Sequence, residues 1–128
     1  MNSSISLQQA LYQLFSTDYP TYEILPKDGI MPFILIGDET VTRADTKNTK
    51  RSVHAITVHT YVKGKSSLID KQLKQFVQMK IEEELIVKGF SVEFIELELV
   101  SNKNEQLDSG SVIYHGIIEY RITLTKKE

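Results

Sequence analysis

The 128-residue sequence contains no cysteine, which excludes disulfide bridges, thiolate metal sites and thiol nucleophiles. It also has no apolar run close to the roughly 20 residues that a membrane-spanning helix requires. Its first residues, MNSSISLQQALYQLF, lack the basic and long apolar segments of a signal peptide. We therefore expect a protein that is made and kept in a cytoplasm, or assembled into a larger structure there, with no membrane partner.

Basic and acidic residues are nearly balanced in number. Lys and Arg together number 15 and Asp and Glu 17, which gives a formal net charge of -2. Such a chain is not attracted as a whole to nucleic acid or to an anionic membrane, so contacts of that kind would depend on a local patch. Hydrophobic residues make up 41% and charged residues 25%, as in soluble globular proteins. The length predicts a single domain over residues 1–128.

Catalytic and ligand-binding motifs are also scarce. The histidines are His54, His59 and His115, and the first two lie five positions apart in a predicted strand. They therefore point to opposite faces and cannot bind one metal ion, and a site that combines a histidine with aspartate or glutamate has no supporting spacing. No serine lies in a G-x-S-x-G turn, and the glycines are too scattered for a phosphate-binding loop. The sequence predicts no enzyme and no catalytic, cofactor-binding or metal-binding residue.

The first predicted helix lies near the N-terminus. Ser6 precedes Gln9 by three positions, the spacing of a capping box, so the helix is expected to start there. It should end before Asp18, because Pro20 disfavours helical geometry at Tyr19. Its apolar residues recur at helical spacing: Leu7, Leu11, Leu14 and Phe15.

The second predicted helix has the clearest apolar stripe in the chain. Ser67 and Asp70 have capping-box spacing at its start, and Gly89 is expected to cap its end. The stripe consists of Ile69, Leu73, Phe76, Val77, Ile81 and Leu85. This pattern predicts a helix that buries one face and exposes its lysines, glutamines and glutamates.

Four segments are predicted as strands, over 33–36, 52–62, 90–101 and 111–125. Alternation in the second gives a core face of His54, Ile56, Val58, Thr60 and Val62. In the third, the alternation changes phase, and a β-bulge near Phe94 and Ile95 would bring both apolar sets to one side. The last has a core face of Val112, Tyr114, Ile118, Tyr120, Ile122 and Leu124.

The order of these elements predicts the fold class. It runs helix, strand, long loop, strand, helix, strand, strand. The first two strands are expected to pair as a hairpin with a long loop, and the last two as another. The predicted class is therefore α+β, with a mainly antiparallel sheet of about four strands and two helices packed on one face.

The segment GDETVTRADTKNTKRS, residues 37–52, is predicted as neither helix nor strand. Long structureless loops are uncommon in compact domains and are usually functional or disordered. Four basic residues against one acid give it a local charge of +3: Arg43, Lys47, Lys50 and Arg51 against Asp45. Either the loop is solvated and mobile, or it becomes ordered against a partner protein or nucleic acid. It holds no aromatic residue between its charges, so it is not a stacking platform for single strands.

The chain resembles the tail terminator proteins of long-tailed bacteriophages, also called tail completion or tail-to-head joining proteins. Four stretches carry the resemblance and together span nearly the whole chain. They are LQQALYQLFSTDYPTYEILPKDGIMPFILIG, TKNTKRSVHAITVHTYVKG, IDKQLKQFVQMKI and SNKNEQLDSGSVIYHGIIEYRITL. The likeness is one of element order and texture, without a single diagnostic motif.

The resemblance implies an α+β virion structural protein that forms a ring with itself, typically a hexamer. In that family the ring caps the tail-tube protein, stops tube polymerisation and offers a surface to the head-tail connector. DNA passes through its channel without sequence-specific binding. The implied location is the virion, at the junction of tail and head, after assembly in the cytoplasm of the host bacterium. Carried over, residues 38–51 become the interface or channel loop, ordered only against neighbouring subunits.

Two alternatives remain open at this point. Another neck or head-completion protein of the same virion would share this size and texture. A small cytoplasmic ligand-binding domain would instead need a pocket, lined by residues such as His54, Tyr61 and Tyr114.

Overall fold

The computed structural model describes residues 2–127, which form two helices and a sheet of six strands. In chain order the elements are α1 (Ser3–Ser16), β1 (Thr21–Tyr22), β2 (Phe33–Arg43), β3 (Arg51–Gly64), α2 (Leu68–Glu84), β4 (Phe90–Asn102), β5 (Glu105–Gln106) and β6 (Val112–Lys126). The predicted α+β class is confirmed, but the sheet has more strands than predicted. The two that were missed, β1 and β5, have two residues each, too few for an alternating pattern.

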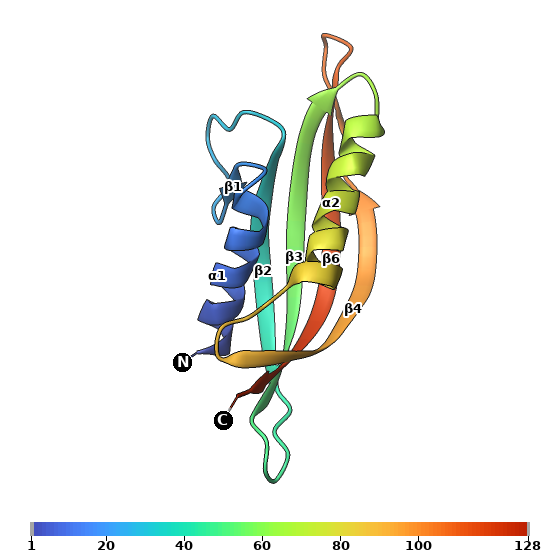
Figure 1. Cartoon of the computed structure of the whole chain (residues 1–128). Helices are drawn as coiled ribbons and strands as arrows, with labels where there is room; N and C mark the ends of the chain where they lie inside the picture. The colour runs from blue at the N-terminus through green and yellow to red at the C-terminus, as the bar shows by residue number, and fades with distance from the viewer. Residues whose placement is uncertain (1, 128) are drawn as a thin grey trace.

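The sheet is antiparallel except at one edge. Its strand order is β1-β2-β3-β6-β4, with β5 paired to the start of β6, and only β1 and β2 run parallel. The predicted pairings of β2 with β3 and of β4 with β6 are confirmed. Because β6 lies between β3 and β4, helix α2 connects two strands that run parallel without pairing (Figure 1).

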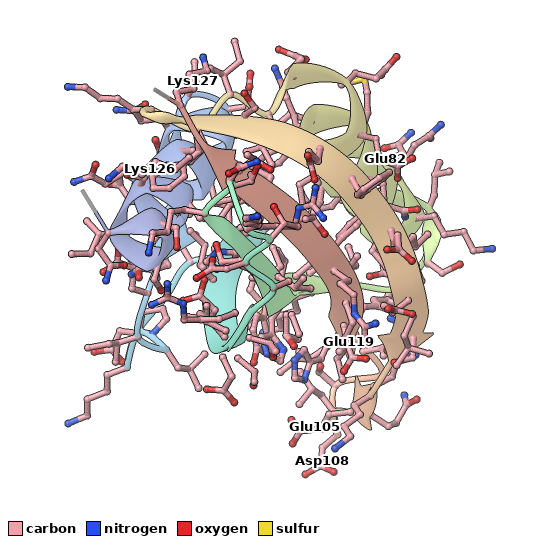
Figure 2. The ribbon with its side chains drawn as sticks, turned by 90° about the horizontal axis from the view of Figure 1, so that it is seen from below. Glu82, Glu105, Asp108, Glu119, Lys126 and Lys127 are labelled. Atoms are coloured by element: carbon pink, nitrogen blue, oxygen red, sulfur yellow. The ribbon has the colours of Figure 1, made fainter. Side chains whose placement is uncertain are left out.

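Both helices cover one side of the sheet, which we call the helix face; the other side is the open face (Figure 1). The predicted core residues of β3 lie on the helix face and are buried: His54, Ile56, Val58, Thr60 and Val62. Strand β6 adds Ile118, Tyr120, Ile122 and Leu124 to this core, while Val112 and Tyr114 are half-buried. In a view along the long axis, Glu82 of α2 and Glu119 of β6 lie on the two sides of the sheet (Figure 2).

Helix α1 begins earlier than predicted. The side chain of Asn2 accepts hydrogen bonds from the backbone N–H groups of Ser4 and Ile5, at 2.8 and 3.2 Å, and caps the helix. Ser6 lies inside the first turns and is buried, so the predicted capping box is wrong. The predicted end before Asp18 is confirmed. Within residues 2–127, neither helix combines the length and the hydropathy needed to cross a membrane.

Helix α2 begins after Ser67 as predicted, but its predicted caps are wrong. Ser67 makes no side-chain capping bond. Asp70 is instead buried, where it accepts a hydrogen bond from Asn102 at 3.1 Å and pairs with Lys74 at 3.2 Å. Gly89 lies beyond the helix end, and its φ of 85° forms the turn that precedes β4.

The centre of the α2 stripe packs on the sheet. Leu73, Val77 and Ile81 are buried, whereas Ile69 in the first turn is about half exposed. Leu85 follows the helix in an extended conformation and is also buried. This contact holds the connection to β4 against the core.

Strand β4 contains two register shifts, one between Val92 and Phe94 and one between Leu97 and Leu99. The first confirms a bulge close to the predicted place, and it brings Val92 and Ile95 onto the helix face. Phe94 and Leu99, however, lie opposite open-face residues of β6, so the expectation that all apolar residues share one side is wrong. Bulges bend a strand, and β4 curves strongly beside β6 (Figure 2).

Gly116 sits at the most crowded glycine position of the sheet, and its replacement gives a first prediction. A Cβ there would lie 2.2 Å from Thr60 Oγ1 and 3.0 Å from Lys74 Cδ. Thr60 is fully buried, so any shift of its side chain disturbs the packed core. We expect Gly116→Ala to lower the free energy of unfolding by about 2 kcal/mol, within the usual range for overpacking. Urea denaturation followed by circular dichroism measures the change.

Gly64→Ala is the matched control. The nearest atom to a Cβ at Gly64 is the Ser66 carbonyl oxygen at 4.0 Å, an ordinary contact. Its stability should stay the same or rise slightly, because alanine reduces the freedom of the unfolded chain. Equal losses for the two variants would mean that the cost comes from glycine flexibility and not from the Thr60 contact.

Candidate assembly surfaces

The segment predicted as a long loop, 37–52, is mostly a β-hairpin. Strand β2 continues to Arg43 and β3 begins at Arg51, so residues 44–50 alone form the connection. The pairing of β2 with β3 has a single irregularity, which follows Ile36. The prediction of a structureless segment is therefore wrong. The hairpin projects beyond the end of the sheet where both chain termini lie (Figure 1).

The tip of this hairpin is organised by Asp45. Its carboxylate pairs with Arg43 and accepts a hydrogen bond from the backbone N–H of Arg51 at 3.0 Å. These bonds, first that from Arg51 and then that from Arg43, lower the pKa of Asp45. Thr46 and Thr49 exchange backbone hydrogen bonds of 3.0 and 3.4 Å across the turn. The tip is therefore a closed turn with a defined shape.

A cavity of about 290 Å³ lies at the base of the tip. It is lined by Asn2, Ser3, Val41, Arg43, Asp45, Lys50, Arg51, Ser52, Phe90 and Lys126. The structure thus brings four of the five predicted loop residues to one place, while Lys47 lies outside this wall on the exposed turn. Strand β6 ends at Lys126, which lines this cavity, and Lys127 follows it beside Lys50, so both lysines add to the basic character of this end of the molecule.

A chain of hydrogen bonds that contains the buried His54 connects the hairpin to the start of α1. The ring of His54 is fully buried, with Nδ1 2.7 Å from a carboxylate oxygen of Glu39 and Nε2 2.8 Å from the hydroxyl of Ser52. Glu39 also accepts a hydrogen bond from Ser4, and the hydroxyls of Ser52 and Ser3 are 3.2 Å apart. Because the imidazole has no exposed surface, this network fixes the hairpin against α1 and offers nothing to a substrate.

The alternative ligand pocket is contradicted by the positions of its three residues. His54 and Tyr61 lie on opposite faces of β3, and Tyr114 faces the helices beside Val62. On the open face, Tyr61 stacks between Phe33 and His115, with ring centroids 4.8 and 4.3 Å apart. These aromatic rings bridge three adjacent strands and do not surround a cavity with His54.

One lateral edge of the sheet is formed by β4, whose outer side has no partner strand among the described residues. This strand exposes four large apolar side chains, which we call the β4 edge surface: Phe94 (59%), Leu97 (44%), Leu99 (44%) and Val100 (39%). Phe94 and Leu99 lie on the open face of the strand and Leu97 and Val100 on its helix face, so apolar side chains are exposed on both sides of this unpaired edge. Single exposed apolar residues are normal, but several on an unpaired sheet edge are typical of a contact with another chain.

Strand β4 also carries three glutamates: Glu93, Glu96 and Glu98. Two of them form ion pairs inside the subunit: Glu93 with Arg51 at 2.9 Å and Glu98 with Arg121 at 3.3 Å. The pair with Arg51 joins β4 to the base of the hairpin. These charges therefore lie next to the β4 edge surface and leave its apolar residues accessible.

The opposite lateral edge also exposes apolar side chains. We call it the β1 edge surface, and it combines residues of α1 with the loop between β1 and β2: Ile5 (57%), Tyr12 (43%), Ile24 (83%), Leu25 (56%) and Ile30 (83%). Tyr12 and Ile24 also border a shallow depression of about 480 Å³. Sequence reasoning missed both edge surfaces, because it assigned the apolar residues of β4 to the core and left the loop after β1 without a role.

Within residues 2–127, no group of three or more His, Cys, Asp or Glu side chains is placed to hold a metal ion. No protein-family model matches the chain, and no curated protein matches its sequence. The fold is similar to that of a chain in the virion of a native gene transfer agent particle. The match has a TM-score of 0.67 at 15% identity and covers 94% of this chain and 97% of the other.

Proposed function

We propose that the chain is a structural subunit of a phage-like virion, which acts through protein contacts and catalyses no reaction. The observation that carries this proposal is the shared fold, because the similar chain belongs to a virion and is matched over almost the full length of both. The finer proposal follows the resemblance to tail terminators. The subunit forms a ring, typically a hexamer, which caps the tail tube, stops its growth and joins the tail to the head.

The two edge surfaces support a ring. A ring needs heterologous contacts, in which one surface of a subunit meets a different surface of the next. The β4 edge surface and the β1 edge surface lie at opposite ends of the strand order, and both are apolar. We propose that the β4 edge surface of one copy packs against the β1 edge surface of its neighbour, which removes both from water.

The hairpin suits a contact along the axis of the tube. It projects past the sheet at one end of the molecule and carries Arg43, Lys47, Lys50 and Arg51 around Asp45 (Figure 1). We propose that it meets the tail-tube protein or the head-tail connector beside the DNA channel. The positive charge is local and small against the net charge of -2, which allows DNA to pass without strong attraction.

The test replaces two exposed residues on the β4 edge surface. Phe94→Asp/Leu99→Asp places two carboxylates where the ring contact needs apolar surface, and burying them without partners is costly. The wild-type chain, mixed with the tail-tube protein of the same virion, should form rings. The double variant should stay monomeric, with the ring population reduced by at least about tenfold, a change of about 1.4 kcal/mol in contact free energy. Sedimentation velocity and negative-stain microscopy measure it.

Met79→Asp is the matched control, because Met79 is 42% exposed on α2 and lies on neither edge surface. It should assemble like the wild type. Rings formed equally well by the double variant would disprove the proposed contact. Absence of any ring or tube-bound species for the wild type would argue against the tail-terminator role and favour another place in the virion.

A further inference from the structure

The open face carries a pair of histidines that the proposed function does not use. His59 comes from β3 and His115 from β6. Their rings face each other, with His59 Nδ1 2.8 Å from His115 Nε2 and the ring centroids 5.0 Å apart. Both side chains are only partly buried, so solvent and small ions reach them.

The surrounding residues keep the two rings next to each other. The register of β3 and β6 puts His115 opposite Tyr61, one step along the open face from His59, and the Tyr61 ring stacks on His115 at an interplanar angle of 16°. On the other side, Gly37 leaves room for the His59 ring, because a Cβ there would lie 2.8 Å from the ring atoms Cδ2 and Nε2. A larger residue at Gly37 would displace His59 from the pair.

The hydrogen bond between the two rings holds their nitrogens at a separation close to that in a metal chelate. Imidazole nitrogens bind transition metals at roughly 2.0–2.1 Å, so two of them in adjacent positions at a right angle are about 2.9 Å apart. We propose that His59 and His115 form a two-imidazole site for a divalent transition-metal ion of the Cu²⁺ or Ni²⁺ type. Those ions favour square-planar or octahedral geometry, in which such right-angle positions occur. Water molecules occupy the other coordination positions of the ion. The Asp38 carboxylate, at the irregularity in β2, lies nearby.

Imidazole binds metal ions in its neutral form, through a ring nitrogen that carries no proton. In the hydrogen-bonded pair one facing nitrogen carries a proton. Metal binding moves that proton to the other nitrogen of the same ring, and the imidazoles turn so that both lone pairs meet the ion.

The test is isothermal titration of the purified chain with Ni²⁺, with Mg²⁺ as the negative ion, at pH 7. The wild type should bind one Ni²⁺ per chain and no Mg²⁺. His59→Gln and His115→Gln should each weaken binding by at least about tenfold, because even loss of a residue that only orients a ligand costs roughly 10–100-fold. The electron paramagnetic resonance spectrum of bound Cu²⁺ should show coupling to two imidazole nitrogens.

Lys103→Gln is the matched control, since it removes a neighbouring charge and leaves both ligands, and its Ni²⁺ affinity should be kept or slightly increased. Circular dichroism checks that each variant is folded. The site is overturned if the wild type binds no Ni²⁺, or if both histidine variants bind it as tightly as the wild type. The second result would assign the binding to groups outside the pair.

Discussion

Phe15→Ala is expected to lower the free energy of unfolding by about 3–5 kcal/mol, the usual cost of removing a fully buried aromatic ring. Phe15 has no exposed surface and lies at the contact between the two helices. Its ring is 6.5 Å from that of Phe76 on α2, which in turn meets Tyr19 edge to face at 4.9 Å. The alanine variant leaves a void where α1, α2 and the sheet meet, and its neighbours are too closely packed to fill it.

Urea denaturation of the isolated subunit measures this effect. A domain of this size has a stability of roughly 5–15 kcal/mol, so the variant should lose a large part of it, with an unchanged dependence on urea concentration. Tyr12→Ala is the matched control, because Tyr12 is an aromatic residue of the same helix and is 43% exposed. It should change stability by less than about 1 kcal/mol. A comparable loss in both variants would show that α1 is sensitive to any truncation and that the Phe15 packing is not special.

The elements that could be predicted from the sequence are those in which buried residues recur at one constant spacing along the chain. Burial alternates strictly from Val53 to Lys63 in β3, and from Gly116 to Ile122 in β6. Strand β2 could be predicted only as far as Ile36, because from Glu39 onward it extends past the densest part of the core. Its residues there are mostly polar on both sides, so pairing with β3, and not apolar burial, defines the strand.

At the candidate sites, sequence reasoning found residues that are close together in the chain and missed residues that only strand pairing brings together. Arg43, Asp45, Lys50 and Arg51 were identified from local charge, and the turn at the tip of the hairpin brings these four together. The pair of His59 with His115 could not be seen from spacing, because 56 positions separate the two residues and only the β3–β6 register joins them. From the sequence, only an alignment of the predicted core faces of β3 and β6 could have suggested this histidine pair.

Glu39→Ala is expected to lower the free energy of unfolding by about 3 kcal/mol, at the upper end of the cost of leaving a buried polar group without its partner. The carboxylate contacts the fully buried ring of His54 at 2.7 Å and also accepts a hydrogen bond from Ser4. In the alanine variant, His54 Nδ1 is left in the core without a hydrogen-bond partner. Glu39→Gln keeps an acceptor for His54 and Ser4, so it should lose clearly less.

The wild type should also lose this stabilisation in acid. Burial raises the pKa of Glu39, but the hydrogen bonds from His54 and Ser4 and the charge of His54 together lower it below its ordinary value of 4.5. A carboxylate with a lowered folded-state pKa stabilises the fold fully above its unfolded pKa, and the contribution disappears as the pH falls through the folded pKa. The pH range over which this stabilisation is lost therefore lies below 4.5.

Urea denaturation of the wild type and of Glu39→Gln, from about pH 6 to about pH 3, isolates the contribution of Glu39. The other carboxylates, including Asp45 with its lowered pKa, are present in both proteins and cancel in the difference. The wild type should be the more stable of the two at pH 6, and the gap should close as Glu39 becomes protonated. A gap that stays constant over this range would mean that the charge of Glu39 contributes nothing, and that its hydrogen bonds alone hold the hairpin against α1.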